Sequence, residues 1–562
     1  MDYDEASYKR TGITKLTIDI PSSHRTRRPE EYRSPPRWRT LEFAFYYLVF
    51  AVVLPMWVWI PVQLSKENHP NFGLYAHKLS WGWLGRPVDN SDSQYRSFRN
   101  NLPTLALLVL AFLSSKWVYT RIALRSLTPP ALNNLHHIPF LVIFSILMLL
   151  GLHGLSIFKI MLILGINYRI AKLGRGQKWA PLATWVFNCL ILFANEWYDG
   201  YPFARMHPSL APLDLIKGAY PRWNISFNIT MLRLLSFNMD YYWACTSAKT
   251  ALSGDTSAVL TEKQRTTQTH SLDTYTFWNY LAYVLYPPLY IAGPIMTFND
   301  FMWQHRRPTS VPFRTIVNYA ARFLSSLLVM ELILHFMYMV AIKDTKAWRN
   351  DSPFELSMIG IWNLFIVWLK LLLPWRFFRL WALAGGIDPP ENMVRCCANN
   401  YSTLGFWRSW HRSYNLWLIR YIYIPLGGAK HAALTTVLIF TFVALWHDIS
   451  FQLLAWGWLI SLFILPELLA AYLLPASKHA SKPWYRHVCA IGGVFNLIMM
   501  ISANLAGFAI GTEGVMYMLN EMLSTWSGLQ FTMAAFVCIF VAVQLMFEYR
   551  EEEMRRGVFR RC

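Results

Sequence analysis

Long apolar runs separated by short polar segments recur along most of this chain. A run of about 20 apolar residues can cross a bilayer as a helix, because a helix satisfies its own backbone hydrogen bonds there. The pattern predicts an all-α polytopic membrane protein with about 10–12 transmembrane helices. The candidate spans are Phe43–Val62, Leu102–Val118, Pro139–Ile166, Leu182–Ala194, Tyr280–Ile295, Phe323–Ile342, Met358–Leu373, Leu434–Leu445, Leu453–Leu474, Val488–Ile510 and Leu529–Phe547.

Several of these runs are short or contain proline. Pro139–Ile166 is long enough for one tilted helix or for two short segments around the sequence GLHGLS. We therefore expect re-entrant or interfacial segments among the true membrane spans.

Composition supports the membrane assignment. Of the 562 residues, 54% are hydrophobic and 15% are charged, whereas soluble domains are about 25% charged. The formal net charge is +20, but the cations flank apolar runs instead of forming a basic face in water. Nucleic acid is therefore not expected as a partner, and anionic lipid headgroups or an anionic substrate fit better.

The two ends of the chain carry clusters of arginine. Residues 1–40 form a basic, Pro-rich segment without the apolar region of a signal peptide, and we expect it to be disordered. Residues 549–562 form a second charged tail, and residues 41–548 form one membrane domain. Because cytosolic segments are enriched in Lys and Arg, both termini are predicted to be cytosolic, with an even number of crossings.

A dense aromatic and basic stretch, GFWRSWHRSYNLWLIRYIYIPLGG, begins at Gly405. A helix over Phe406–Ile419 would place one histidine on an aromatic face and a polar stripe beside it. The aromatic face comprises Trp407, Trp410, His411, Tyr414 and Trp417, and the stripe comprises Arg408, Arg412 and Asn415. A helix lying at the membrane interface would explain this pattern structurally, but it does not explain the histidine.

A second histidine ends an apolar helix and is followed by an acid, as His447 and Asp448. An ionisable group in a membrane segment is costly and marks a functional candidate. Imidazole accepts and returns protons near neutral pH. The alternative is a structural His–Asp pair at a helix end.

Other ionisable residues lie within apolar runs. Arg322, Glu331 and His335 share one run, and Lys370 lies in another. They indicate either structural pairs inside the membrane or the coupling groups of a proton-dependent transporter.

Two histidines, each preceded by tryptophan and separated by one apolar helix, resemble the membrane-bound O-acyltransferase family at His411 and His447. Further segments resemble its fungal glycerol-uptake branch, which reacylates lyso-GPI anchors. They are VDNSDSQYR, YIAGPIMTFND, KAWRNDSPFELSMIG, WRFFRLWALAGGIDPPENM and WYRHVCA. The related branch that acylates Hedgehog proteins has Asp where His411 stands, which places this chain nearer the O-acylating members.

The resemblance implies transfer of a very-long fatty acyl chain from acyl-CoA to the sn-2 hydroxyl of a lyso-GPI lipid or GPI-anchored protein. The expected location is the endoplasmic reticulum membrane, with the plasma membrane as a second location. His447 would be the general base, and His411 or Asn415 would hold the hydroxyl or the oxyanion. Asp448 would orient an imidazole. A glycerol/proton symporter using Glu331, His335 and Lys370, and a protein acyltransferase, are the alternatives.

Two ligand predictions follow. Arginines near the two histidines would meet the phosphates of acyl-CoA, with lipid contact as the alternative for each. They are Arg408, Arg412, Arg420, Arg376 and Arg379. Some relatives hold haem through a cysteine ahead of the Trp-containing helix, and Cys396 lies in that region. Haem ligation by its thiolate is therefore a further expectation, with a buried or palmitoylated cysteine as the alternative. The seven scattered cysteines do not form a disulfide framework.

Overall fold

The computed structural model describes residues 35–126, 133–247, 260–308 and 311–556, together with Val558 and Arg560. Most of the N-terminal segment that we expected to be disordered lies outside the described residues. The first helix, α1, begins at Leu41, where the Thr40 side chain accepts a hydrogen bond from the backbone N–H of Phe43. The last helix, α23, ends at Arg555 and so includes much of the predicted C-terminal tail.

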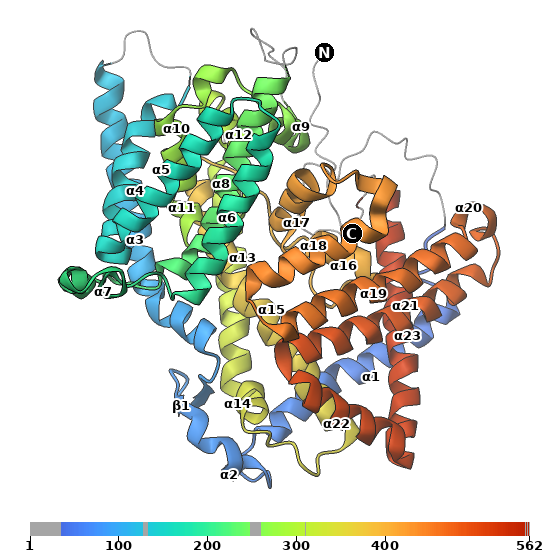
Figure 1. Cartoon of the computed structure of the whole chain (residues 1–562). Coiled ribbons are helices and arrows are strands. Elements are labelled where there is room, and N and C mark those ends of the chain that lie inside the picture. The colour runs from blue at the N-terminus through green and yellow to red at the C-terminus, as the bar shows by residue number, and fades with distance from the viewer. Residues whose placement is uncertain are drawn as a thin grey trace.

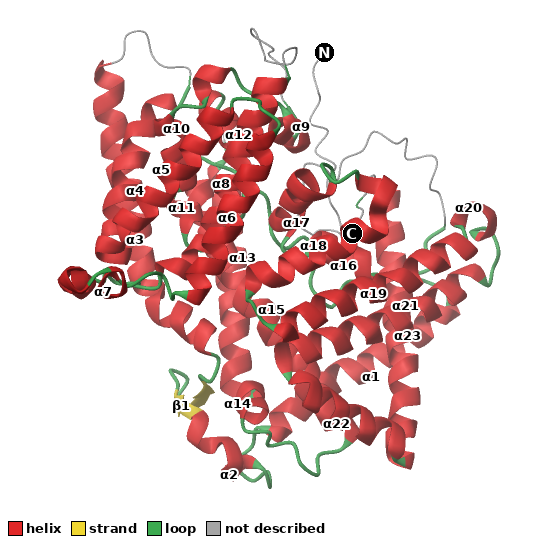
Figure 2. Cartoon of the chain, in the orientation of Figure 1, coloured by secondary structure: helices red, strands yellow, loops and turns green. Residues whose placement is uncertain are grey.

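The described chain is helical almost throughout, which confirms the predicted all-α class (Figure 2). Its strands are the three-residue pair β1 (Leu79–Trp81) and β2 (Pro87–Asp89), paired antiparallel with Leu79 opposite Asp89. The α-helices are α1 (Leu41–Leu64), α2 (Phe72–Tyr75), α3 (Ser93–Ser126), α4 (Ile138–His153), α5 (Ile157–Gly174), α6 (Trp179–Trp197), α7 (Phe203–Met206), α8 (Trp223–Thr246), α9 (Glu262–Thr267), α10 (Phe277–Val284), α11 (Pro287–Tyr290), α12 (Phe298–Arg306), α13 (Phe313–Phe336), α14 (Met339–Asp344), α15 (Pro353–Ala384), α16 (Thr403–Ser409), α17 (Arg412–Leu418), α18 (Ala432–His447), α19 (Phe451–Leu473), α20 (Ala476–His479), α21 (Tyr485–Asn504), α22 (Gly511–Ser524) and α23 (Trp526–Arg555). Short 3₁₀ turns are η4 (Ala76–Lys78), η5 (Leu135–His137), η6 (Gly154–Ser156), η7 (Pro208–Leu215), η8 (Leu272–Thr274) and η10 (Gly428–His431), and π-helical turns are η9 (Ile419–Tyr423) and η11 (Leu505–Ala509).

The helices form two groups joined by a central pair (Figure 1). Helices α3–α6, α8 and α10–α12 make one group, and α1, α18, α19 and α21–α23 make the other. The long helices α13 and α15 run between them and pack against each other. The short α16 and α17 lie beside α18, where the second group meets the centre.

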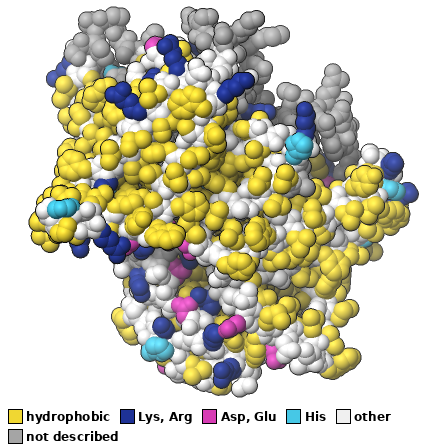
Figure 3. Space-filling model, in the orientation of Figure 1, with side chains coloured by type: hydrophobic (Ala, Val, Ile, Leu, Met, Phe, Trp, Pro, Cys, Tyr) yellow, Lys and Arg dark blue, Asp and Glu magenta, His cyan; other side chains and the backbone are white. Residues whose placement is uncertain are grey.

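Eight helical segments of the described ranges are long and apolar enough to cross a membrane, and α18 is a shorter apolar helix. The eight are Leu41–Leu64, Ser93–Ala123, Leu135–Gly174, Phe313–Phe336, Pro353–Ala384, Phe451–Leu473, Tyr485–Ala509 and Trp526–Arg555. Hydrophobic side chains form a broad band on the face in Figure 3, with most charged side chains above the band and over the lower part of the molecule. Such a band suits contact with lipid. These findings confirm a polytopic membrane protein.

Three predicted spans differ from single helices. Phe323–Ile342 is divided between α13 and α14, because α13 ends at Phe336 and Met337 is extended. The run around GLHGLS becomes α4 and α5, separated at Gly154, whose φ of 55° lies in the left-handed region. A Cβ at this position would overlap the carbonyl oxygen of Ile216, so glycine allows the 216–218 loop to cross there. Tyr280–Ile295 is not one helix but α10 and α11, because Pro287 and Pro288 begin a new turn.

The N-terminal end of α1 lies against the C-terminal end of α23. The backbone N–H of Arg37 donates to the Glu548 carboxylate at 3.0 Å, and Phe43 and Tyr46 pack with Val541. Arg37 and Glu548 are therefore on the same side of the membrane, as an even number of crossings requires. Which side faces the cytosol stays a prediction.

Candidate active site

The stretch around His411 is not the single helix that its spacing predicts. Helix α16 ends at Ser409, α17 begins at Arg412, and His411 adopts left-handed backbone angles, with φ 43° and ψ 50°. Trp410 is extended and forms an antiparallel bridge with Met393. The prediction of one continuous aromatic face over Phe406–Ile419 is therefore wrong. A non-glycine residue in this conformation costs about 1–3 kcal/mol, and such strain is concentrated at functional sites.

Contacts from distant segments hold this turn in place. The Arg412 backbone N–H donates to the Asn392 carbonyl at 3.1 Å, and the Ser413 N–H donates to the Asn392 side-chain oxygen at 3.2 Å. The Arg412 guanidinium binds both oxygens of Glu262 at 3.1 and 3.2 Å, and both side chains are buried. The 388–393 loop and α9 thus fix the start of α17. The sequence gives no signal for either partner.

The His411 ring lies in an aromatic stack. It is nearly parallel to Trp375, with ring centroids 4.6 Å apart at 25°, and it lies 5.2 Å from the Tyr414 ring. Burial, with the neighbouring His447 as a second cause, lowers the pKa of His411 to about 3. The imidazole is therefore neutral at physiological pH and able to accept as well as donate a hydrogen bond.

His447 is the last residue of α18, and the tryptophan before it is tied to α8. The Asn228 side-chain amide donates to the Trp446 carbonyl at 3.1 Å, and the Trp446 indole N–H donates to the Asn228 carbonyl at 2.8 Å. Trp446 packs on Tyr414 with ring centroids 4.5 Å apart, and on His447 at 4.8 Å. Tyr414 and Trp446 thereby connect the two histidines through one aromatic cluster.

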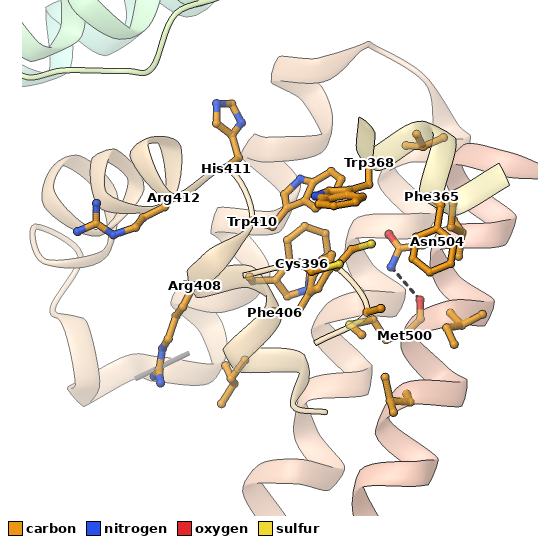
Figure 4. Close-up of a pocket in the computed structure, with 18 of the residues that line it drawn as sticks. Phe365, Trp368, Cys396, Phe406, Arg408, Trp410, His411, Arg412, Met500 and Asn504 are labelled. Carbon is orange, nitrogen blue, oxygen red and sulfur yellow. Dashed lines mark hydrogen bonds between the residues drawn. The ribbon is translucent and has the colours of Figure 1, made fainter. Parts of the chain in front are cut away.

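Both histidines line one cavity of about 1600 Å³. Most of its wall is apolar and comes from α1, α15, α16–α19, α21 and α23. In Figure 4, Cys396, Phe406 and Trp410 lie on one side of the gap and Phe365, Met500 and Asn504 on the other. Neither imidazole has a hydrogen bond or ion pair with any residue that the structure describes. Their ring nitrogens are therefore available to molecules in the cavity.

The other two predicted polar residues, Asn415 and Asp448, differ in their position relative to the cavity. Asn415 lines the same cavity, and its side chain makes no hydrogen bond within the described ranges. Asp448 is exposed on extended backbone just after α18 and does not line the cavity. No hydrogen bond or ion pair joins it to either histidine. The geometry therefore supports Asn415 over Asp448 as a group near the imidazoles.

Of the five predicted phosphate-binding arginines, only Arg408 and Arg412 line the cavity. Three of the five face carboxylates: Arg412 pairs with Glu262, Arg420 with Asp240 at 2.7 Å, and Arg379 with Asp388 at 2.7 Å and Glu391 at 3.4 Å. Arg376 donates to Ser326 at 2.5 Å. The structure thus does not bring these five cations together at one site, and their binding to acyl-CoA stays a prediction.

Cys396 also lines the cavity. A hydrogen bond with the Cys397 side chain lowers the pKa of the Cys396 thiol to about 7. A partly ionised thiol on a cavity wall has the donor chemistry of a haem ligand. Cys396 is the residue that would hold a haem, and its ligation of iron stays a prediction.

The ionisable residues of the alternative transporter site are paired elsewhere. Glu331 accepts from Tyr95 at 2.6 Å and Trp83 at 2.9 Å and pairs with Arg99 at 2.8 Å. Lys370 pairs with Asp92 at 2.7 Å. None of these groups lines the cavity, and their contacts tie α13 and α15 to the β1–β2 segment and α3. These contacts agree with the interpretation of Glu331 and Lys370 as members of structural pairs inside the membrane.

The family model for MBOAT, the membrane-bound O-acyltransferase family, matches residues 214–512. Over 540 residues, the chain is 48% identical to membrane-bound O-acyltransferase GUP1 of Saccharomyces cerevisiae, covering 94% of both chains. The chain belongs to the membrane-bound O-acyltransferase family. It is also 40% identical over 558 residues to GUP2 of the same yeast, covering 94% of this chain and 90% of the relative.

A more distant relative acts on protein. Protein-cysteine N-palmitoyltransferase HHAT of Mus musculus is 27% identical over 281 residues, covering 47% of this O-acyltransferase and 56% of the relative. The GUP-type relatives match nearly the whole chain. The chain is therefore an O-acyltransferase of the GUP1/GUP2 type.

Proposed function

We propose that this O-acyltransferase transfers a very-long fatty acyl chain from acyl-CoA to the free sn-2 hydroxyl of a lyso-GPI lipid in the endoplasmic reticulum membrane. The observation that carries the proposal is that the imidazoles of His411 and His447 both line one large apolar cavity. Its volume of about 1600 Å³ exceeds the roughly 300–1,000 Å³ of ordinary small-molecule pockets. An acyl chain and a lipid acceptor need that apolar space, whereas glycerol does not.

The reaction proceeds by direct transfer. His447 takes the proton of the acceptor hydroxyl as its oxygen attacks the thioester carbonyl, and the carbonyl electrons move onto the oxygen. His411 and the Asn415 amide donate hydrogen bonds to the hydroxyl or to this oxyanion. When the tetrahedral intermediate collapses, the C–S bond breaks and His447 returns the proton to the departing CoA sulfur. No external oxidant or metal enters this balance.

The partners follow from this proposal. Acyl-CoA is a polyanion and would approach from the cytosolic side, where Arg408 at the cavity wall is the first arginine to test. The acceptor is a lyso-GPI lipid or the anchor of a GPI-linked protein, and membrane lipids surround the apolar band. A haem on Cys396 would add no step to acyl transfer.

The test is an acyl-transfer assay on purified protein with labelled acyl-CoA and lyso-GPI or lysophosphatidylinositol. We expect His447→Ala to lower transfer by about two to four orders of magnitude, the usual share of a general base. His411→Ala should lower it less if this residue only orients the acceptor. Asp448→Asn is the matched control, because this neighbouring side chain contacts neither imidazole, and it should retain activity.

Glycerol uptake by cells carrying the same variants separates enzyme from transporter. A symporter would require Glu331 and His335 and would tolerate loss of His447. Palmitoylation of a cysteine or amine on protein, with no transfer to lysolipid, would indicate a protein acyltransferase instead. Full acyl transfer by His447→Ala at normal protein levels would show that the proposed mechanism is wrong.

A further inference from the structure

One face of α8 carries groups that bind both of the segments in which the candidate histidines lie. Positions four residues apart share one face of a helix, and this row consists of Asn228, Leu232, Ser236 and Asp240. Asn228 at one end of the row binds Trp446, the residue before His447. The other three positions bind α17 and η9, which follow His411 in the chain. Both imidazoles are therefore connected to a single helix face.

Helix α17 turns the side away from the cavity toward this row. The Trp417 indole N–H donates to the Leu232 carbonyl at 3.0 Å and to the Ser236 hydroxyl at 2.9 Å. Trp417 is buried and absent from the cavity wall, whereas Tyr414 and Leu418 of the same helix line the cavity. Helix α17 thus lies between the cavity and α8.

Asp240 holds the turn that follows α17. Its Oδ1 accepts from the Arg420 guanidinium at 2.7 Å and from the Tyr421 hydroxyl at 3.0 Å. Its Oδ2 accepts from the backbone N–H of Asn299 in α12 at 3.3 Å, and the residue is fully buried. Arg420 and Tyr421 belong to η9, a π-helical turn, and such turns are rare and frequent at functional sites. One carboxylate therefore fixes this turn to α8 and α12.

A column of aromatic rings leads from Asp240 to His411. The ring centroids of Tyr421 and Trp417 are 5.3 Å apart, and those of Trp417 and Tyr414 are 6.2 Å apart. The Tyr414 ring in turn lies 5.2 Å from the His411 ring. Close-packed side chains transmit a displacement, because no free space absorbs it. A shift of Tyr421 should therefore move the imidazole.

We propose that Asp240 is a positioning residue for acyl transfer, which holds the His411 imidazole in place through η9 and this column of rings. The inference rests on the proposed function, in which His411 donates to the hydroxyl or to the oxyanion. Asp240 is absent from the cavity wall, so it acts through these residues and not on a substrate. With Asn228 at the other end of the row, it lets one face of α8 set the separation of the two imidazoles.

The experiment is steady-state kinetics of the full-length protein with labelled acyl-CoA and lysophosphatidylinositol. Asp240→Asn keeps the size of the side chain but leaves one acceptor oxygen where the contacts use two. We expect kcat to fall by about tenfold, with KM for acyl-CoA changed by less than about twofold, because small displacements of a catalytic group cost up to about 10²-fold. Tyr421→Phe removes a single hydrogen bond and preserves the ring, so it keeps the fold. Its kcat should fall by about two- to tenfold.

Asn238 provides the matched control, because it ties α8 to α5 and α6 instead. Its buried side-chain amide donates to the carbonyl and side-chain oxygens of Asn167 and to the Thr184 hydroxyl, each at 3.1 Å. Asn238→Ala thus removes buried hydrogen bonds of the same helix without altering the row. It should lower the melting temperature at least as much as Tyr421→Phe and leave kcat nearly unchanged.

A double-mutant cycle with His411→Ala separates positioning from a general loss of packing. If Asp240 acts through His411, Asp240→Asn and Tyr421→Phe should have little further effect on kcat once the imidazole is absent. The candidate base His447 remains in this background, so labelled product can still be measured. A purely structural role would instead give the same fold loss with and without His411.

The outcomes distinguish this inference from the proposed function. Absence of acyl transfer by wild type would contradict the proposed function. If wild type is active, an unchanged kcat in Tyr421→Phe or a change confined to KM would overturn the positioning role. An equal loss of kcat in Asn238→Ala, or an undiminished effect of Tyr421→Phe in the His411→Ala background, would overturn it as well.

Discussion

Asn228 of α8 and Trp446 of α18 hold each other by two hydrogen bonds across 218 positions of sequence. The amide of one donates to the carbonyl of the other, and the indole N–H donates in return. Because His447 follows Trp446 directly, this pair sets where the last turn of α18 ends. The position of the candidate base therefore depends on a residue that has no role in the chemistry.

We expect Asn228→Ala to lower kcat by roughly tenfold or more, with little change in KM for acyl-CoA. The substitution frees the Trp446 carbonyl, and small displacements of a catalytic group cost up to about 10²-fold. Steady-state kinetics with lysolipid measure the split. Asn224→Ala, one turn earlier in α8, is the matched control. Equal losses in both variants, or a change confined to KM, would contradict a positioning role for Asn228.

Arg408 and Arg412 should behave differently although they are one helical turn apart in sequence. Arg412→Ala leaves the buried Glu262 carboxylate without its partner, and breaking such a pair costs about 3–5 kcal/mol. We expect a lower melting temperature for Arg412→Ala, and recovery when Glu262→Gln is added. Arg408→Ala should instead raise KM for acyl-CoA. An unchanged KM in folded Arg408→Ala protein would assign this arginine to lipid contact.

The depressed pKa of His411 gives a pH dependence of stability. The folded imidazole stays neutral down to about pH 3, whereas an unfolded histidine takes up a proton near pH 6.5. The unfolded state therefore binds more protons as pH falls below 6.5, and the protein loses stability. Between pH 7.5 and 5.5 the loss is about 1.4 kcal/mol. Thermal unfolding at both pH values should show a smaller decrease for His411→Gln than for wild type.

Glycosylation of the loop around Asn350 can test the predicted topology. Asn71, just beyond the end of α1, donates to the Arg349 carbonyl and to Asp351. This loop therefore lies at the opposite end of α1 from Arg37. If both termini are cytosolic, a sequon in the 345–352 loop receives a glycan and sequons added at either terminus do not. The mass shift removed by a glycosidase is the measurement, and glycosylation at a terminus would reverse the assignment.

Haem binding by Cys396 predicts a Soret band in protein purified from haem-replete cells. Cys396→Ala should abolish the band, because it removes the thiolate ligand. Cys397→Ala is the neighbouring control and should keep a band with an altered position, since the hydrogen bond to Cys396 is lost. A colourless wild-type preparation would exclude this cofactor.

The spacing of apolar residues was sufficient to predict the membrane class, because lipid imposes length and composition on every span, whereas the family was predicted from the resemblance of the motifs around His411 and His447. The same spacing failed at His411, where a helix was expected. There the bridge from Trp410 to Met393 and the bonds from Asn392 outweigh local helix preference. The partners Glu262 and Asn228 were not predicted either. Both residues come close to the site only when the chain folds, and the residues next to them in the sequence do not indicate this contact.

The contact between Arg37 and Glu548 also bears on how the chain is made. The two residues are 511 positions apart, so at about 5–20 residues per second the ribosome needs roughly half a minute to two minutes between them. Throughout that time Phe43 and Tyr46 of the first helix lack Val541, their partner in the last. Helix α1 therefore stays without this part of its packing until α23 has been made. Until Glu548 has been made, the backbone N–H of Arg37 must donate to water, lipid headgroups or another protein.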